Sequence, residues 1–322
     1  MGSGRRLTTA ALVSAAAVAL TACTGDSPPA SQRTPAARPS SAPTASLTAP
    51  PTASPTAAAK GPGAGVVRPR GPEQAAAVLA SAERVVSRPG TPVSQLRRAA
   101  RRQQLAYRAL ADHPAWEDAV LAAVPRSMHS VVRDNLAARR EFRSMHLVLS
   151  DSLPAWRIVP PAPAEQLLRF YKRGERVYGI GWEYLAAINL VETAMGRIRG
   201  TSTAGAQGPM QFLPSTWAQW GRGDIDDPAD AIMAAARYLA HDGGAQPGGI
   251  DDALFRYNNS RQYVRGVTLL AGVMERQPRA YYGYYHWDVY YLTSRGDVRL
   301  PVGYDRDRPL PVARWLATHP QR

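Results

Sequence analysis

The sequence predicts a mainly α-helical protein with a small β-hairpin near its C-terminus. Apolar residues recur at a spacing of three to four over much of the stretch from residue 73 to residue 276, which is typical of helices with one buried face. Prolines and glycines interrupt this pattern at intervals and mark where helices begin and end. Two short β-type runs, His286–Thr293 and Val298–Tyr304, flank Ser294–Asp297 and predict a hairpin.

The first 23 residues read as a targeting segment. Arg5 and Arg6 precede an uncharged apolar run, Leu7–Leu20, which is too short for a typical spanning helix. The run ends in Leu20-Thr21-Ala22-Cys23, a match to the bacterial lipobox, in which the cysteine is lipidated. We therefore predict a lipoprotein signal peptide over residues 1–23 and an extracytoplasmic protein, lipid-anchored through Cys23 to the outer face of the cell membrane and reaching into the cell wall. An ordinary secretory peptide with an incidental cysteine is the alternative, and it also places the protein outside the cytoplasm.

Residues 24–72 are predicted to be a disordered linker. The segment consists largely of Pro, Ala, Ser and Thr, and it cannot bury enough apolar surface to offset the entropy of ordering. Because Cys23 is the only cysteine of the chain, no intrachain disulfide is expected. The linker would hold the folded part away from the membrane.

Residues 73–160 form a predicted arginine-rich helical extension. Its expected helices are Glu73–Ser87, Val93–Asp112, Ala115–Ala123 and Ser127–Val148. The whole chain carries a net charge of +14, and loss of residues 1–23 removes two arginines, leaving 37 basic minus 25 acidic residues, or +12. An exported protein rarely meets nucleic acid, so we expect attraction to anionic wall polymers or lipid headgroups. Solvated arginine faces without a ligand are the alternative.

The most informative helix is expected over Trp182–Met195, where Leu185, Ile188, Val191 and Met195 form an apolar stripe. Glu192 falls on this stripe and in the last helical turn. Loss of water and the negative end of the helix dipole both favour the protonated carboxyl, as a general acid requires. The alternative is a structural glutamate paired with Arg197 or Arg199.

The segments that follow Glu192 are expected to approach a ligand. Gly200–Pro209 is a loop of small residues, and it continues into Met210-Gln211-Phe212 and a short helix from Pro214 that ends at Gly221. The remaining helices expected in this region are Ala164–Tyr178, Pro228–His241, Asp252–Tyr257 and Ser260–Arg276. The acidic run Asp224–Asp227 lacks the spacing of a calcium loop, so we assign it to helix capping and expect no metal and no cofactor.

The order of these motifs resembles that of the lytic transglycosylases. The shared pattern is the Glu-Thr helix end, the segment Gly-Pro-Met-Gln-Phe-Leu-Pro-Ser-Thr-Trp and a later Tyr-Asn pair, within about Leu167 to Glu275. Sequence on both sides is similar to the lipoprotein members found in actinobacteria. The resemblance implies a lysozyme-like catalytic domain over residues 161–276, followed by an aromatic-rich hairpin and tail over residues 277–322. It also implies Glu192 as catalytic residue and substrate contacts from Thr193, Met210, Gln211, Tyr257 and Asn258.

The expected reaction follows from the resemblance and from one missing group. Lytic transglycosylases cleave the bond between N-acetylmuramic acid and N-acetylglucosamine in peptidoglycan. Hydrolysis usually needs a second carboxylate, and no acidic residue lies in residues 193–223. We therefore expect Glu192 to act first as acid and then as base, producing 1,6-anhydro ends, in a monomer that contacts glycan strands and no nucleic acid. A lysozyme-type muramidase and a non-catalytic wall-binding lipoprotein are the alternatives.

Overall fold

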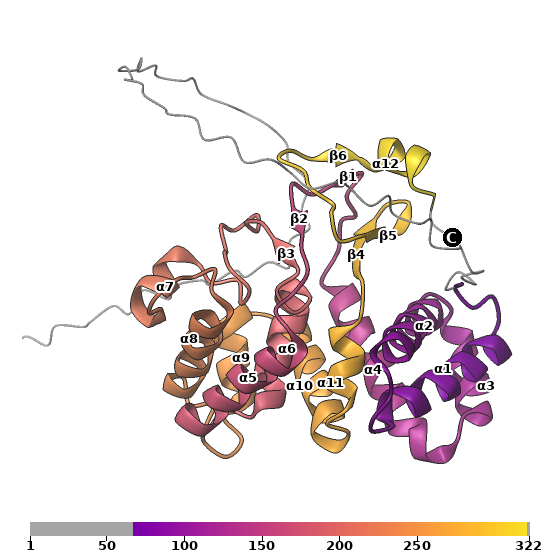
Figure 1. The fold of residues 1–322 in the computed structure, drawn as a ribbon, viewed down its shortest axis with the longest axis horizontal. Coiled ribbons are helices and arrows are strands. Elements are labelled where there is room, and N and C mark those ends of the chain that lie inside the picture. The colour runs from indigo at the N-terminus through magenta and orange to yellow at the C-terminus, as the bar shows by residue number, and fades with distance from the viewer. Residues whose placement is uncertain (1–66, 321–322) are drawn as a thin grey trace, which may run out of the picture. The chain divides into compact units, whose positions relative to one another are not determined.

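A computed structural model describes residues 67–320 as a helical body with three small antiparallel sheets (Figure 1). Its α-helices are α1 Pro72–Ser87, α2 Val93–Asp112, α3 Glu117–Ala123, α4 His129–Ser144, α5 Ala164–Tyr178, α6 Trp182–Thr193, α7 Pro214–Trp220, α8 Pro228–His241, α9 Ile250–Asn258, α10 Arg261–Arg276, α11 Ala280–Tyr285 and α12 Val312–Thr318. Short 3-10 turns over Pro114–Trp116 and Arg126–Met128 precede α3 and α4. The mainly α-helical fold class is confirmed.

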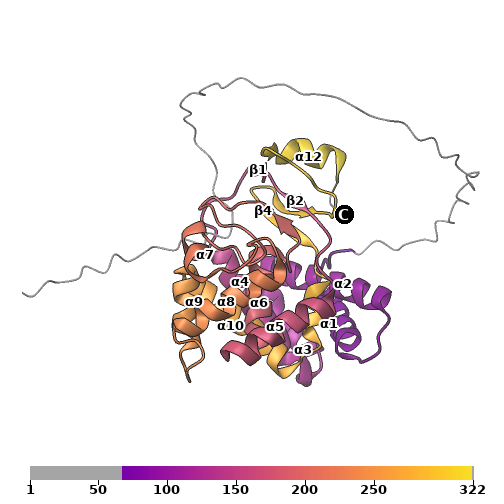
Figure 2. The same cartoon turned by 60° about the vertical axis from the view of Figure 1, so that its left-hand side comes forward.

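The helical extension and the helices after residue 164 share one core. Tyr107 of α2 and Leu136 of α4 belong to the same buried cluster as Leu185 of α6 and Tyr263 of α10. Helix α10 lies between the two groups and contacts both α4 and α6 (Figures 1 and 2). The close approach of α10 to α4 needs a glycine, because a Cβ on Gly266 would lie 2.5 Å from the Phe142 ring.

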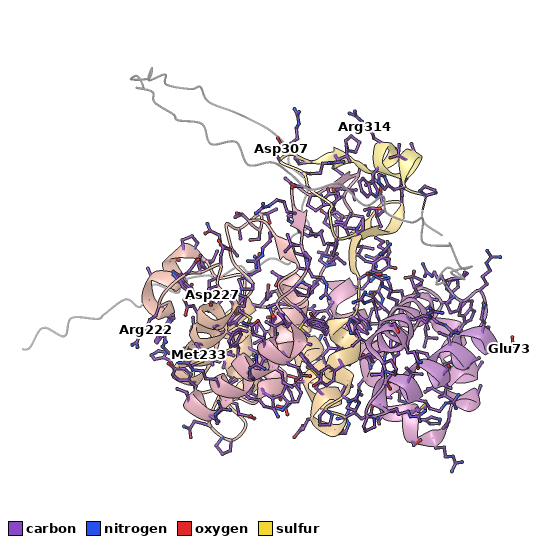
Figure 3. The ribbon with its side chains drawn as sticks, in the orientation of Figure 1. Glu73, Arg222, Asp227, Met233, Asp307 and Arg314 are labelled. Atoms are coloured by element: carbon purple, nitrogen blue, oxygen red, sulfur yellow. The ribbon has the colours of Figure 1, made fainter. Side chains whose placement is uncertain are left out.

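Local signals set several helix boundaries where the sequence predicts them. The bounds of α2, α5 and α8 match the prediction residue for residue. The Asp227 carboxylate accepts hydrogen bonds from the backbone N–H groups of Ala229 and Asp230, so the predicted N-cap of α8 is confirmed (Figure 3 labels Asp227 at this helix start). Helix α7 ends at Trp220, and Gly221 follows as its C-cap, as predicted.

The strands form three pairs above the helices in Figure 1. They are β1 Ser152–Leu153 with β6 Leu310–Pro311, β2 Arg157–Ile158 with β3 Ile198–Arg199, and β4 Val289–Thr293 with β5 Gly296–Leu300. A second, smaller core lies among them and includes Trp156, Tyr291, Tyr304 and Trp315.

The hairpin is present with a tighter turn than predicted. Thr293 pairs with Gly296, so the turn is Ser294-Arg295 instead of the four residues Ser294–Asp297. Gly296 has φ +92°, which only glycine adopts without strain, and it allows β5 to begin at once. Asp297 therefore lies in a strand, opposite Leu292, and not in a turn.

Two further predictions need correction. Helix α6 ends at Thr193 and not at Met195, because Ala194 and Met195 adopt left-handed φ angles of 52° and 65°. The tyrosines expected to pack on the helical body from the hairpin come partly from α11, where Tyr281 and Tyr284 are fully buried. The end of the predicted linker is placed as well, since Arg68 forms an ion pair with Asp112 at the surface.

The signal peptide, Cys23 and the linker up to residue 66 lie outside the described residues, and the domain boundaries stay predictions. Within residues 67–320, no helix combines the length and the apolar character that crossing a bilayer would require.

Candidate active site

The C-terminal end of α6 is fastened to the loop that follows it. The Thr193 hydroxyl donates a 2.6 Å hydrogen bond to the Pro209 carbonyl, and the Asn189 side-chain amide donates to the same oxygen at 2.7 Å. Tyr171 of α5 donates to the Asn189 Oδ1 at 2.6 Å and fixes that amide. The helix itself closes through bonds from the Ala194 and Met195 N–H groups to the Leu190 and Asn189 carbonyls. Glu192 thus lies on a rigid helix end.

The Gly-Pro-Met-Gln segment forms a tight turn beside that helix end. Gln207 and Phe212 exchange two backbone hydrogen bonds, and the Gln211 N–H donates to the Gly208 carbonyl across the turn. Gly208 has φ +72°, and a Cβ there would lie 2.0 Å from the Ile225 carbonyl oxygen, so only glycine fits. The Tyr257 hydroxyl donates a 2.6 Å bond to the Met210 carbonyl and holds the turn from the side of α9.

Residues with strained backbone conformations lie near Glu192 and in the Gly-Pro-Met-Gln turn. Of the described non-glycine residues, Ala194, Met195, Gln211 and Asn259 have positive φ. These positions follow Glu192 closely, lie in the Gly-Pro-Met-Gln turn, or follow Asn258. A non-glycine residue in this region costs on the order of 1–3 kcal/mol, and such strain concentrates at functional sites. The surrounding hydrogen bonds hold these conformations.

Glu192 is a half-buried acid with one hydrogen-bond donor. Its Oε1 accepts a 2.7 Å hydrogen bond from the hydroxyl of Tyr263, a fully buried residue of α10. Burial raises the pKa of Glu192 to about 8, and the Tyr263 bond partly opposes this rise. Burial, and then the nearby Glu192 charge, raise the pKa of Tyr263 well above its usual range, so this hydroxyl stays protonated and keeps donating.

Glu192 does not form the ion pair with Arg197 or Arg199 that a purely structural role would involve. Arg197 donates to the Ala194 carbonyl at 2.8 Å and to the Tyr285 carbonyl. Arg199 donates to the Asp226 carbonyl at 3.1 Å and lies 3.8 Å from its carboxylate. Both cations are held by other groups, and Glu192 keeps the environment of a neutral carboxylic acid.

Glu192 lines a pocket together with residues from several other parts of the chain. We divide its lining by the parts of the chain that supply it. One set, here the Glu192 wall, consists of Leu190, Val191, Glu192 and Gln211. A second set, here the arginine wall, consists of Arg108, Arg139, Arg143, Asp288 and Asp297. Aromatic side chains also line the pocket, namely Phe142, Trp156, Trp287, Tyr290 and Tyr291. The arginine wall comes from α2, α4 and the segment that leads into and forms the hairpin.

Charges in the arginine wall are compensated only in part. Asp297 Oδ2 accepts from Arg108 at 2.7 Å and from Arg139 at 2.8 Å. Asp288 pairs with Arg101 at 3.1 Å through one oxygen and with Arg299 at 2.9 Å through the other. Burial, then the neighbouring Arg139, lower the pKa of Arg108 to about 9, which Asp297 opposes, so Arg108 stays charged at neutral pH.

The residues predicted for substrate contact divide into two groups. Gln211 lines the pocket together with Glu192. Thr193, Met210, Tyr257 and Asn258 are buried, and none of them lines this pocket. The hydroxyls of Thr193 and Tyr257 donate their hydrogens to carbonyls of the turn, so each could contact a sugar only as an acceptor while those bonds last. In this structure Thr193 and Tyr257 hold the turn that carries Gln211, and the substrate contacts expected of Thr193, Met210, Tyr257 and Asn258 stay predictions.

Sequence reasoning missed several residues of the site. Tyr263 and Asn189 lie at buried helical positions whose sequence pattern fits ordinary core residues. Asp297 was placed in a turn, and the arginines of α2 and α4 were interpreted as surface charge. A polar residue on an apolar helix face, such as Asn189 on the face of Leu185 and Ala186, was a local signal for the site. Within residues 67–320, no group of three or more His, Cys, Asp or Glu side chains could hold a metal ion.

A helical domain that presents one buried carboxyl group to a pocket is consistent with the lysozyme-like class of glycan-cleaving domains. Residues 170–271 match the family model described as Transglycosylase SLT domain. Residues 170–271 are thus a lytic transglycosylase domain, so the protein is an enzyme that acts on the glycan strands of peptidoglycan, and its place of action is the cell wall outside the cytoplasm. No curated protein and no solved structure matches the chain.

Proposed function

We propose that this enzyme cleaves the β-1,4 bond between N-acetylmuramic acid and N-acetylglucosamine without water, and that Glu192 serves both steps. The observation that carries the proposal is the environment of Glu192. Its carboxyl is desolvated, is held at Oε1 by Tyr263, and has a pKa raised to about 8. Such a group is protonated at neutral pH and can donate its proton to a departing oxygen.

In the first step, Glu192 transfers its proton to the glycosidic oxygen as the bond from that oxygen to C1 of the muramic residue breaks. The acetamido group of the same sugar stabilises the positive charge that develops on C1. In the second step, the Glu192 carboxylate removes the proton from the C6 hydroxyl, and the C6 oxygen bonds to C1. The products are a 1,6-anhydromuramic end and a free 4-hydroxyl, and Glu192 is protonated again.

The other carboxylates of the pocket favour this route over hydrolysis. A hydrolase usually uses a second carboxylate as base or nucleophile. Among the residues that line the pocket, the acidic ones besides Glu192 are Asp288 and Asp297. Each of them is shared by two arginines, which favour its unreactive, paired form. Asp224 and Asp227 bond backbone N–H groups at the start of α8 and do not line the pocket.

We assign distinct roles to the residues around Glu192. Gln211 contacts the substrate, because it faces the pocket, while Thr193, Tyr257 and the Met210 carbonyl fix the turn that carries it. Asn258 is buried at the end of α9, directly after Tyr257. Positioning of the C6 hydroxyl matters because an intramolecular nucleophile in line with C1 has a high effective concentration, which lets it compete with water.

The test is to digest purified glycan strands in ¹⁸O-water and to analyse the new ends by mass spectrometry. We expect unlabelled anhydro ends, lighter than hydrolysed ends by one water. Predominant ¹⁸O at free reducing ends would show a muramidase and would overturn the single-glutamate route.

We also propose that the protein is a monomeric lipoprotein of the actinobacterial type, anchored through Cys23, with its extension attracted to anionic wall polymers. The support is the sequence Leu20-Thr21-Ala22-Cys23 after a charged and then apolar leader. Diacylglyceryl attachment supplies the two acyl chains that stable anchoring needs. Cys23→Ala should move the protein from the membrane fraction to the medium or leave an unprocessed precursor. Wild-type protein that is soluble and carries no lipid mass would refute the anchor.

A further inference from the structure

The pocket beside Glu192 is only partly built by the matched family domain. Residues 170–271 supply the Glu192 wall, whereas the arginine wall comes from α2, α4 and the segment from Asp288 to Asp297, all outside that range. The extension is fixed in place by the contact of α4 with α10, the same helix whose Tyr263 holds Glu192. A ligand bound at Glu192 is therefore adjacent to residues that the family domain alone does not contain.

Positive charge exceeds negative charge at the arginine wall. The wall has three arginines, Arg108, Arg139 and Arg143, and two carboxylates, Asp288 and Asp297. Asp288 pairs outside the wall with Arg101 and Arg299, and the Asp112 charge also acts on Arg108 and Arg139. The Nε atoms of Arg101, Arg108 and Arg139 are buried without a hydrogen-bond partner, so the protein does not supply enough acceptors. Arg108 also lies over the Tyr290 ring, with its guanidinium carbon 4.0 Å from the ring centre, and cannot easily turn away.

Arg143 adds a further cation, and it is the accessible one. It is exposed and lines the pocket from the last turn of α4. Within the described part of the chain, no carboxylate forms an ion pair with it; its charge acts on Arg139, which has the same sign, and on His146, another residue of the pocket lining. An anionic group that entered the pocket would meet the Arg143 guanidinium first, and would be drawn by the surplus charge behind it.

We propose that the arginine wall is a subsite for a carboxylate of the peptide stem carried by peptidoglycan, with Arg143 as the contacting residue. This inference rests on the proposed cleavage at Glu192. The muramic sugar beside the scissile bond carries a peptide branch on its lactyl group, and this branch ends in free carboxylates. The branch leaves the sugar close to Glu192, and the same pocket offers guanidinium groups for carboxylates and aromatic rings for the aliphatic part.

Selectivity between two substrates tests the subsite. The substrates are glycan strands that carry their peptide stems and the same strands stripped of peptides by an amidase. We expect the wild-type enzyme to have the higher kcat/KM on strands with stems. Arg143→Gln should reduce the ratio of the two kcat/KM values by about ten-fold, chiefly through KM, because one charge-assisted hydrogen bond at a partly exposed site is lost. Arg143→Lys should retain part of the preference, and added salt should weaken it.

Arg133→Gln is the matched control, because Arg133 is exposed on the same helix and does not line the pocket. It should keep the wild-type ratio. Arg108 and Arg139 are unsuitable, since removing either takes away one of the two cations that share the buried Asp297 carboxylate. A wild-type enzyme without preference for stems, or an Arg143→Gln loss equal on both substrates, would overturn the subsite and leave the cleavage reaction intact. Failure of the wild-type enzyme on both substrates would instead refute the proposed function and the subsite with it.

Discussion

The two walls of the pocket treat buried ionisable groups in opposite ways. At the Glu192 wall, the carboxyl accepts a hydrogen bond from Tyr263 and is uncharged at neutral pH, because burial raises its pKa to about 8. At the arginine wall, Arg108 and Arg139 keep their charges because they share Asp297, whose side chain is only 8% exposed. The Glu192 wall therefore holds a neutral acid that can donate a proton, whereas the arginine wall keeps its positive charges.

The difference shows what the catalytic group needs to avoid. A guanidinium next to a carboxylate typically lowers the carboxyl pKa by about 1–3 units, which would ionise Glu192 at neutral pH. Arg197 follows Glu192 by only five positions, yet its donors are occupied by the Ala194 and Tyr285 carbonyls. These hydrogen bonds thus keep the Arg197 guanidinium from pairing with the Glu192 carboxyl, which has to remain neutral.

The largest effect is expected when the Glu192 wall loses its acidic proton. Glu192→Gln keeps the shape and can still accept the Tyr263 hydrogen bond, but it has no proton to transfer. We expect the rate of glycan cleavage to fall by about a hundred- to ten-thousand-fold or more, with wall binding retained. Release of soluble fragments from purified peptidoglycan measures the loss.

Glu183→Gln is the matched control for this variant, because Glu183 lies in the first turn of the same helix α6 and does not line the pocket. It should cleave at close to the wild-type rate. Circular dichroism of both variants shows whether the fold is kept. Comparable turnover by a well-folded Glu192→Gln protein would remove Glu192 from its assigned role.

The Glu192 wall could be predicted from the sequence to a large extent, because its signals are local. The helix, the glutamate near its end, the Gly-Pro turn and the Asp227 cap each involve a few neighbouring residues. Their geometry follows from helix periodicity, from glycine at Gly208 and from side-chain capping. The end of α6 was predicted two residues late, because left-handed alanine and methionine at a helix end have no clear sequence signature.

The arginine wall could not be predicted, since it exists only through tertiary contacts. Asp297 and Arg108 are far apart in the chain, and each alone fits a turn residue or a solvated surface charge. The tyrosines of α11 favour strands by intrinsic preference, yet Tyr284 is helical, buried and bonded to Asn135 of α4. Long-range packing decided both cases, and no pattern within one segment contains that information.

A smaller change would sharpen the comparison by altering the Glu192 wall without removing its acid. Because the active form in the first step is protonated, kcat/KM should decrease as pH rises through about 8, the pKa of Glu192. The Tyr263 hydrogen bond stabilises the ionised carboxylate and so lowers that pKa. Tyr263→Phe removes the bond and keeps the ring. The pKa of Glu192 should therefore rise further, and the alkaline decrease in activity should move to higher pH. The variant should also be slower near neutrality, because its acid is less well positioned.

Tyr257→Phe is the control, since the Tyr257 hydroxyl bonds the Met210 carbonyl and not Glu192. A Tyr263→Phe profile that stayed in place or moved to lower pH would mean that Tyr263 does not tune this acid.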